Sequence, residues 1–143
     1  GWVLGAPDLL ASVRKVHDFL TVNAPAPLQQ AGVLAMGLEQ SFLATVAEHY
    51  RERRDLLFRI LENAGFQPYQ PQGAYYIMAG MKGFGFDDDQ AFARHLVENI
   101  GVAGVPGSSF HEDPRDGAGL IRFCFCKKLE TLEEFGRRLA RLR

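Results

Sequence analysis

One apolar run with a single charge inside it constrains this chain more than any other feature. Gly119–Cys126 reads Gly-Leu-Ile-Arg-Phe-Cys-Phe-Cys, and every member except Arg122 is apolar or small. Such a run predicts a buried strand. A guanidinium keeps its charge in a protein, and burying it without an anionic partner is costly. Arg122 therefore needs either an Asp or Glu of this chain, in a structural ion pair, or the anionic group of a ligand.

A second strand is predicted over Gly73–Ala79, after a short edge strand at Phe66–Gln70. Side chains alternate between the two faces of a strand, so Tyr75 and Tyr76 should point in opposite directions. One of them should lie on the same side of the sheet as Arg122, and the other should pack under a helix. Aromatic side chains in strands are usually part of the core, so the pattern alone assigns neither tyrosine to a ligand.

The first 65 residues are mainly helical by pattern. Pro7 and Asp8 are suited to the first turn of a helix, and a short helix is expected over Gln29–Met36. Residues 38–64 carry apolar side chains at three- and four-residue steps and charges on the opposite face. They predict one helix of about 40 Å, which is long for a small domain and is expected to bridge two. Gly65 can adopt the left-handed conformation that ends it.

From residue 66 onward, strands and helices alternate, which predicts an α/β fold (α+β-like) with helices on one side of a small sheet. A net charge of −1 favours no nucleic-acid or membrane-surface partner, and no apolar run is long enough to span a membrane. Cys124 and Cys126 lie on alternate positions of one strand. We interpret them as small core residues in a reducing compartment.

Three other chemistries are disfavoured by spacing. Asp87, Asp88 and Asp89 are explained by the positive end of a helix dipole, and the polar segment 111–116 matches no metal-ligand pattern, so no metal site is expected. Ser108 and Ser109 follow Pro106 and Gly107, but no G-x-S-x-G elbow surrounds them. A serine hydrolase is therefore the weakest of the possible enzymes.

Several short motifs occur along the chain in one order. Gly1-Trp-Val-Leu-Gly5, Arg14–Thr21, Pro25–Gln30, Pro71–Tyr76 and Gly101–Phe110 all precede the strand that contains Arg122. In this order they resemble the C-terminal part of the class I and II aminotransferases, fold type I of the pyridoxal-phosphate (PLP) enzymes. The resemblance covers essentially the whole chain. No single motif is specific, but their ordered combination is.

The resemblance implies a domain organisation. Residues 1–37 would be the C-terminal end of a large cofactor domain, 38–65 a linking helix, and 66–143 a mostly antiparallel C-terminal small domain. The lysine that carries PLP is expected upstream of Gly1, because no lysine of this chain stands in the matching context. The chain by itself is thus expected to be inactive, and the full-length protein is expected to be a cytoplasmic homodimer.

The resemblance also assigns residues. The full-length enzyme would transfer an amino group from an L-amino acid to a 2-oxo acid with PLP as cofactor; Arg122 would bind the substrate α-carboxylate, and Tyr76 would lie beside the substrate. Val3 stands where the family usually has Arg or Lys for the cofactor phosphate, and valine supplies neither charge nor donor. The loop with Asn23 and Pro25 would contact the neighbouring subunit's active site, or would be an ordinary connector between helices.

A different class of function stays open beside the enzyme. The same fold could be a non-catalytic module that binds a carboxylate through Arg122, or a dimerisation domain without cofactor chemistry. Both alternatives would contain the strand with Arg122, and neither would need the lysine that carries PLP. A search for that lysine and for PLP binding therefore discriminates between them and the aminotransferase.

Overall fold

The computed structural model describes residues 1–142 and divides into two compact units, Gly1–Leu43 and Ala44–Arg143. The first unit contains α1 (Pro7–Thr21), α2 (Ala26–Ala35) and the first residues of α3 (Gln40–Ala64). The second contains the rest of α3 and all strands. The three-part division expected from the sequence, at residues 37/38 and 65/66, stays a prediction.

The helices of the first unit follow from local pattern. α1 begins at Pro7 as expected, with Asp8 in its first turn. α2 begins at Ala26, three residues earlier than expected, because Pro27 fits within the first turn of a helix, where no backbone N–H is needed. None of residues 1–43 is buried, although α1 has a clear apolar stripe. This unit therefore has helices without a core of its own.

The long helix α3 ends where the sequence indicated. Gly65 has φ +97°, and the N–H of Phe66 donates to the carbonyl of Leu61 at 3.0 Å. This left-handed residue reverses the chain out of the helix and into the sheet.

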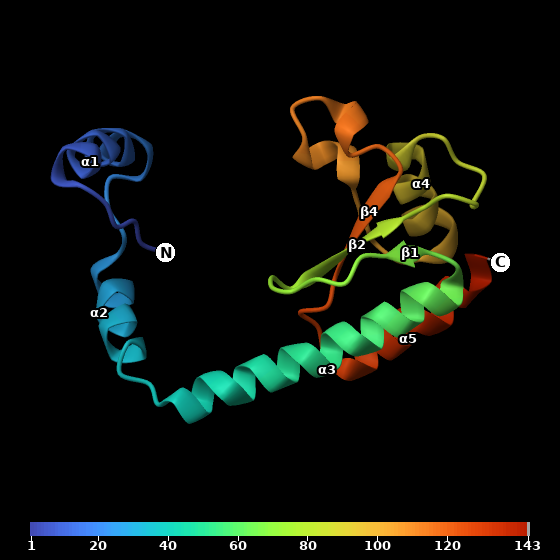
Figure 1. Cartoon of the computed structure of the whole chain (residues 1–143), viewed down its shortest axis with the longest axis horizontal. Helices are drawn as coiled ribbons and strands as arrows, with labels where there is room; N and C mark the ends of the chain where they lie inside the picture. Colours follow the sequence, from blue (N-terminus) through green and yellow to red (C-terminus); the bar gives the residue numbers. More distant parts are fainter. Residues whose placement is uncertain (143) are drawn as a thin grey trace. The chain divides into compact units, whose positions relative to one another are not determined.

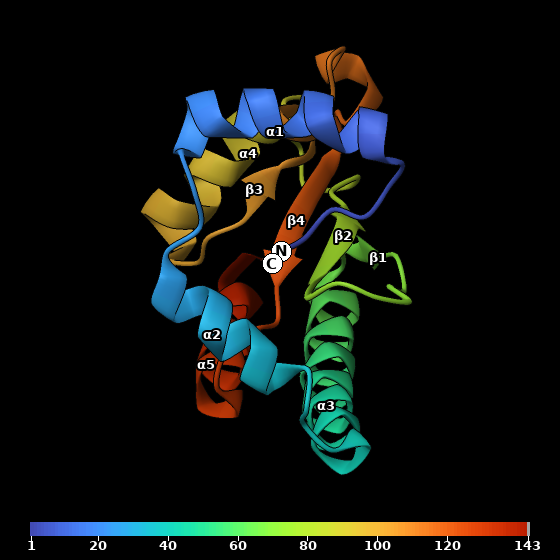
Figure 2. The same ribbon diagram turned by 90° about the vertical axis from the view of Figure 1, so that its left-hand side faces the viewer.

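The sheet has four antiparallel strands in the order β1-β2-β4-β3 (Figure 2). Their bounds are β1 Gln67–Pro68, β2 Tyr76–Gly80, β3 Val105–Pro106 and β4 Leu120–Cys124. The antiparallel arrangement and the edge position of β1 were expected, since Pro68 cannot donate to a central ladder. The strand that contains Arg122 thus lies inside the sheet, between β2 and β3.

The remaining elements connect these strands. They are α4 (Asp89–His95), the π-helical turn η1 (Leu96–Ile100), the 3₁₀ turns η2 (Gly107–Phe110) and η3 (Pro114–Asp116), α5 (Leu129–Leu139) and the 3₁₀ turn η4 (Ala140–Leu142). Gly101 ends η1 with φ +78°, again as expected from its place after the apolar stripe.

One hydrophobic core joins three helices to one face of the sheet. The ring of Phe66 lies 5.9 Å from that of Phe92 on α4 and 5.3 Å from that of Phe123 on β4. Phe123 in turn lies 5.5 Å from Phe135 on α5, and Leu57 and Leu61 bring in α3. Figure 1 shows α3 and α5 running along the same side of the sheet. The predicted fold class, α/β (α+β-like) with helices on one side of a small sheet, is confirmed.

Two expectations about burial are wrong. Tyr75 is exposed and does not pack under a helix, because Ala74 has φ +61° and turns the chain just before β2, which begins at Tyr76. Cys126 is exposed and Cys124 is only half-buried, because both lie on the same face as Arg122, whereas Ile121, Phe123 and Phe125 point into the core. Alternation along a strand shows which residues share a face, but it does not show where the strand begins or which face the helices cover.

Two further findings concern function classes. Within residues 1–142 no helix is long and apolar enough to cross a membrane. The same residues contain no group of His, Cys, Asp and Glu side chains that could hold a metal ion.

Candidate functional site

Arg122 is held in the middle of the sheet. In β4 it pairs with Met78 of β2 on one side and with Val105 of β3 on the other. A residue whose backbone is paired on both sides has little freedom to move, so its side chain leaves the sheet from a fixed point.

Because side chains alternate between the two faces of β4, the side chain of Arg122 points away from the core. Its neighbours Ile121 and Phe123 are fully buried against the helices, whereas Arg122 lies on the opposite face. Tyr76 shares this face, because its partner in the register is Cys124, two residues from Arg122. The sequence predicted one tyrosine on this side, and the structure places Tyr76 there.

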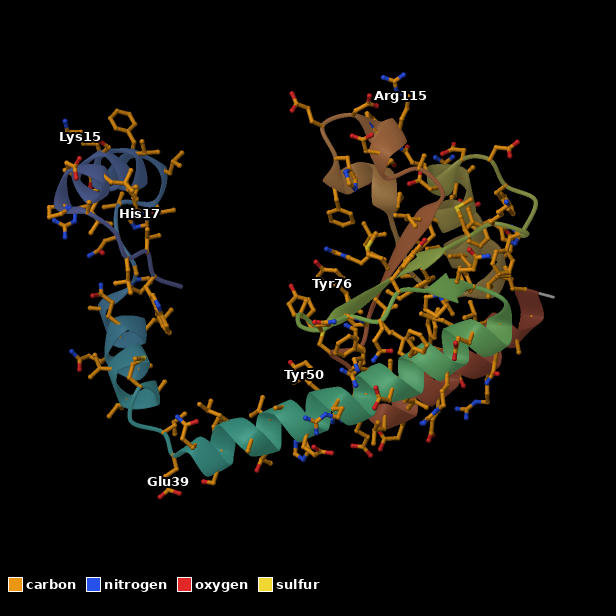
Figure 3. The ribbon with its side chains drawn as sticks, viewed as in Figure 1. Lys15, His17, Glu39, Tyr50, Tyr76 and Arg115 are labelled. Carbon is orange, nitrogen blue, oxygen red and sulfur yellow. The ribbon has the colours of Figure 1, made fainter. Side chains whose placement is uncertain are left out.

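Two aromatic rings contact the guanidinium. Its central carbon lies 4.2 Å from the ring centroid of Phe110 in η2 and 5.0 Å from that of Tyr76 (Figure 3 labels Tyr76 at the start of β2). Both separations are within the range of cation–π attraction. The rings cover part of the guanidinium and restrict its rotation, but neither can accept its hydrogen bonds as an oxygen would.

The Nε atom of Arg122 is buried and has no hydrogen-bond partner among the described residues. Over the same part of the chain, no carboxylate forms an ion pair with Arg122. A buried donor left without an acceptor costs about 1–3 kcal/mol. The structural ion pair that the sequence left open is therefore not formed within residues 1–142, and the planar donor fork is left for an acceptor from elsewhere.

Arg122 also borders an open groove of about 650 Å³ between β3, β4 and α5. Glu134 is a carboxylate of that groove, and it binds Arg137 and Arg138, each at 2.8 Å. The hydrogen bond from Arg138, and then that from Arg137, lowers the pKa of Glu134. Glu134 is thus engaged by its own helix neighbours and does not neutralise Arg122.

A buried carboxylate fixes the turn that carries Phe110. Asp89, the first residue of α4, is 3% exposed, and its two oxygens accept hydrogen bonds from Ser108. The Ser108 N–H donates at 2.8 Å and the hydroxyl at 3.0 Å. The helix dipole alone was expected to explain Asp87–Asp89; that holds for Asp88, which caps α4, but Asp89 has this second, tertiary role.

Two residues of this site were missed by sequence reasoning. From the sequence, Phe110 was expected only to end the turn that begins at Pro106. An aromatic residue directly after such a turn could have indicated a ring beside a ligand. Asp89 was grouped with its acidic neighbours, and nothing in the spacing distinguished it from them.

The other residues singled out by the sequence belong to the first unit. Val3 precedes α1 and is 63% exposed. Pro25 caps α2, and the N–H of Asn23 donates to the carbonyl of Thr21 at 2.7 Å. The valine side chain has no group that could bind a phosphate, so this position does not fit the PLP phosphate. The roles of Val3, Asn23 and Pro25 stay predictions.

The family model for aminotransferase class I and II matches residues 1–139. The chain belongs to the class I and II aminotransferases. These are PLP-dependent enzymes, and the family expected from the ordered motifs is confirmed.

Named relatives agree with the family. A probable N-succinyldiaminopimelate aminotransferase DapC of Mycobacterium tuberculosis is 36% identical, over 98% of this chain and 37% of its own length. The methionine aminotransferase of Escherichia coli is 35% identical, over 99% and 38%. The solved N-succinyldiaminopimelate aminotransferase of M. tuberculosis superposes with a TM-score of 0.91, over 100% of this chain and 37% of that one. The chain thus spans just over a third of the length of these aminotransferases.

Proposed function

We propose that the full-length protein is a PLP-dependent aminotransferase that moves an amino group from an L-amino acid to a 2-oxo acid, and that Arg122 binds the substrate α-carboxylate. The observation that carries this proposal is the buried, unpartnered Nε of Arg122, which lacks a carboxylate among residues 1–142. A carboxylate accepts two parallel hydrogen bonds from a guanidinium, so a substrate carboxylate would supply the missing acceptor.

In this proposal the chain contributes orientation. The fork of Arg122 fixes two atoms of the substrate, and thereby the direction of its Cα–H bond, which is an entropic contribution to rate. Tyr76 and Phe110 keep water from one side of the guanidinium, which strengthens the ion pair. PLP, when bound, supplies the electron sink for the chemistry.

The residues that hold PLP are proposed to lie outside this chain: no lysine of this chain stands in the matching sequence context, and Val3 offers no phosphate ligand. We further propose that the full-length protein is a homodimer in which the loop with Asn23 and Pro25 reaches the neighbouring active site. A cytoplasmic location is proposed from the free cysteines, since persistent thiols are typical of reducing compartments.

The alternative is a non-catalytic module of the same fold that binds a carboxylate or dimerises. The unpartnered Nε of Arg122 also supports a non-catalytic module that binds a carboxylate. Arg122 alone therefore does not distinguish the enzyme from that module. PLP binding does, since only the enzyme needs the cofactor.

The test uses the complete reading frame that contains this chain. Arg122→Lys should raise the KM for the amino donor by about 10- to 100-fold, because an ammonium group cannot reproduce the two-point contact. The PLP absorbance should be retained. Arg115→Lys is the matched control: Arg115 is an exposed arginine of the same unit that pairs with Asp113, and it projects away from the sheet (Figure 3).

Two outcomes would contradict these proposals separately. An unchanged KM in Arg122→Lys would remove the carboxylate assignment while leaving the enzyme intact. A full-length protein that binds no PLP would remove the enzyme and favour the non-catalytic module.

A further inference from the structure

The Asp89–Ser108 pair connects the start of α4 to the turn after β3. Ser108 is 7% exposed and Asp89 3% exposed, so both hydrogen bonds are shielded from water. Among the described residues no Lys, Arg or His forms an ion pair with Asp89. Apart from the helix start, the buried charge is therefore compensated by the two donors of Ser108.

The 3₁₀ turn η2, which contains Ser108 and Phe110, is closely packed and has little room to shift. A Cβ added to Gly107 would clash with the carbonyl oxygen of Gly117, so the two backbone segments touch here. Asp89 holds the turn from the side of α4, and Gly117 limits it from the side of the following loop. Phe110 follows two residues after Ser108, and its ring lies 4.2 Å from the guanidinium carbon of Arg122.

We infer that Asp89 is a positioning residue for the Arg122 site: its carboxylate holds Ser108, and thereby keeps the Phe110 ring against the guanidinium. This inference rests on the proposed role of Arg122 in binding a carboxylate. Asp89 does not touch Arg122 or the substrate. The effect of Asp89 passes through the turn. The backbone N–H of Ser108 is one of the two groups that donate hydrogen bonds to Asp89, and Phe110 belongs to the same 3₁₀ turn as Ser108.

The effect on Arg122 is geometric. Without the ring of Phe110, one contact of the guanidinium is lost and its side chain gains rotational freedom. Ordering it again on substrate binding then costs conformational entropy. The expected signature is therefore a weaker affinity for carboxylates, with a smaller effect on turnover once the substrate is bound.

The test compares neighbouring aspartates in the complete PLP-loaded protein. Asp89→Ala should raise the KM for the amino donor, and the inhibition constant of propionate as a simple carboxylate probe, by about tenfold, and lower kcat less. Asp88→Ala is the matched control. Asp88 caps the same helix through the N–H of Gln90 but does not contact Ser108, so both constants should change by less than about twofold.

Conservative variants keep the test informative if Asp89→Ala does not fold. Asp89→Asn retains the shape and can both accept from the Ser108 N–H and donate to its hydroxyl, so it should restore most of the affinity. Ser108→Ala removes only the hydroxyl bond and should fall between Asp89→Asn and Asp89→Ala. The inference is wrong if Ser108→Ala binds propionate like the parent and Asp89→Ala either does the same or fails to fold, because Asp89 then has only a structural role.

A spectroscopic readout follows the contact directly, without turnover. The guanidinium carbon of Arg122 lies 4.2 Å from the ring centroid of Phe110, so the N–H signals of this guanidinium should be shifted by the ring current, and Arg122→Lys identifies them by their loss. Asp89→Ala should move these signals toward those of a free arginine, whereas Asp88→Ala should leave them in place. Unmoved signals in Asp89→Ala contradict the inference.

A double-mutant cycle separates this inference from the proposal beneath it. In an Arg122→Ala background, Asp89→Ala should have little further effect on propionate binding, because the group that Asp89 positions is gone. An equal effect in both backgrounds means that Asp89 acts independently of Arg122, and overturns the inference alone. If Arg122→Ala itself leaves propionate binding unchanged, the role of Arg122 is wrong and Asp89 has no site to position.

Discussion

The two units of this chain differ in what supports their structure. In Gly1–Leu43, no residue is buried, and Phe19 of α1 is 94% exposed. In Ala44–Arg143, α3, α4 and α5 share one core with the sheet, and Phe92 of α4 is fully buried. Both units have amphipathic helices, so an apolar stripe alone does not make a core.

The difference shows which interactions maintain each helix. Helices of 15 residues or fewer are marginal in water when nothing packs against them. Within residues 1–43, α1 and α2 therefore depend mainly on local propensity, because nothing in this unit buries their apolar faces. α4 is shorter still, but Phe92 and the Asp89–Ser108 bonds fix it to the rest of its unit.

The largest effect is expected when the units are separated. Expressed alone, residues 44–143 should unfold in one cooperative thermal transition, because their core is complete. A peptide of residues 1–43 should show mainly the circular dichroism of an unfolded chain, since it buries nothing. A folded 1–43 peptide, or a 44–143 fragment without a transition, would contradict the comparison.

A matched pair of phenylalanines gives the next largest effect. Phe92→Ala should lower the free energy of unfolding by about 3–5 kcal/mol, because it leaves a cavity in the core. Phe19→Ala should change it by less than about 0.5 kcal/mol, since that ring is exposed. Chemical denaturation of this chain measures both. A large loss in Phe19→Ala would mean that another surface covers α1.

Two glycines are expected to respond with opposite sign. A Cβ on Gly104 would lie 2.8 Å from Cε1 of Phe123 and would also overlap Ile121, so Gly104→Ala should destabilise by about 1–3 kcal/mol. Gly32, inside α2, has open space where a Cβ would lie, with no atom within 4 Å, so Gly32→Ala should stabilise that helix by about 0.5–1 kcal/mol. Helical content and denaturation midpoints check the two signs; equal effects would contradict the comparison.

The smallest effect concerns pH. Arg138 and then Arg137 lower the pKa of Glu134 in the folded protein. The stabilisation from Glu134 is therefore present above its unfolded pKa, about 4.3, and is lost as the pH falls through the lower folded value. Glu134→Gln should slightly lower the Tm at pH 7, and the difference should shrink as the pH falls through the lowered folded pKa of Glu134.

Asp18→Asn in α1 is the control for that titration, because Asp18 forms no ion pair among residues 1–142. It should not reproduce this pH-dependent difference in Tm. A Tm difference in Glu134→Gln that is the same at pH 7 and pH 3 would contradict the assigned ion pairs.

Local elements were predictable because their causes are local. Pro7 opens α1, Gly65 ends α3 and Gly101 ends the π-helical turn, each through a backbone preference of that residue. Strand alternation predicted that one of Tyr75 and Tyr76 shares a face with Arg122, and the register of β2 and β4 shows that it is Tyr76. Tyr75 was assigned wrongly because alternation does not reveal where β2 begins. Cys124 and Cys126 were assigned wrongly because alternation does not reveal which face of the sheet the helices cover.

By itself, the sequence determined the family, the main helices and the unusual arginine in a buried strand, whereas the antiparallel direction of the strands was expected only from the family resemblance. Only the tertiary structure decided that Arg122 has no carboxylate partner within residues 1–142, that Phe110 covers it, and that Asp89 holds Ser108 from 19 residues away. The physical reason is range: backbone preferences and periodicity act over a few residues, whereas charge pairing and ring contacts depend on which distant segments the core brings together.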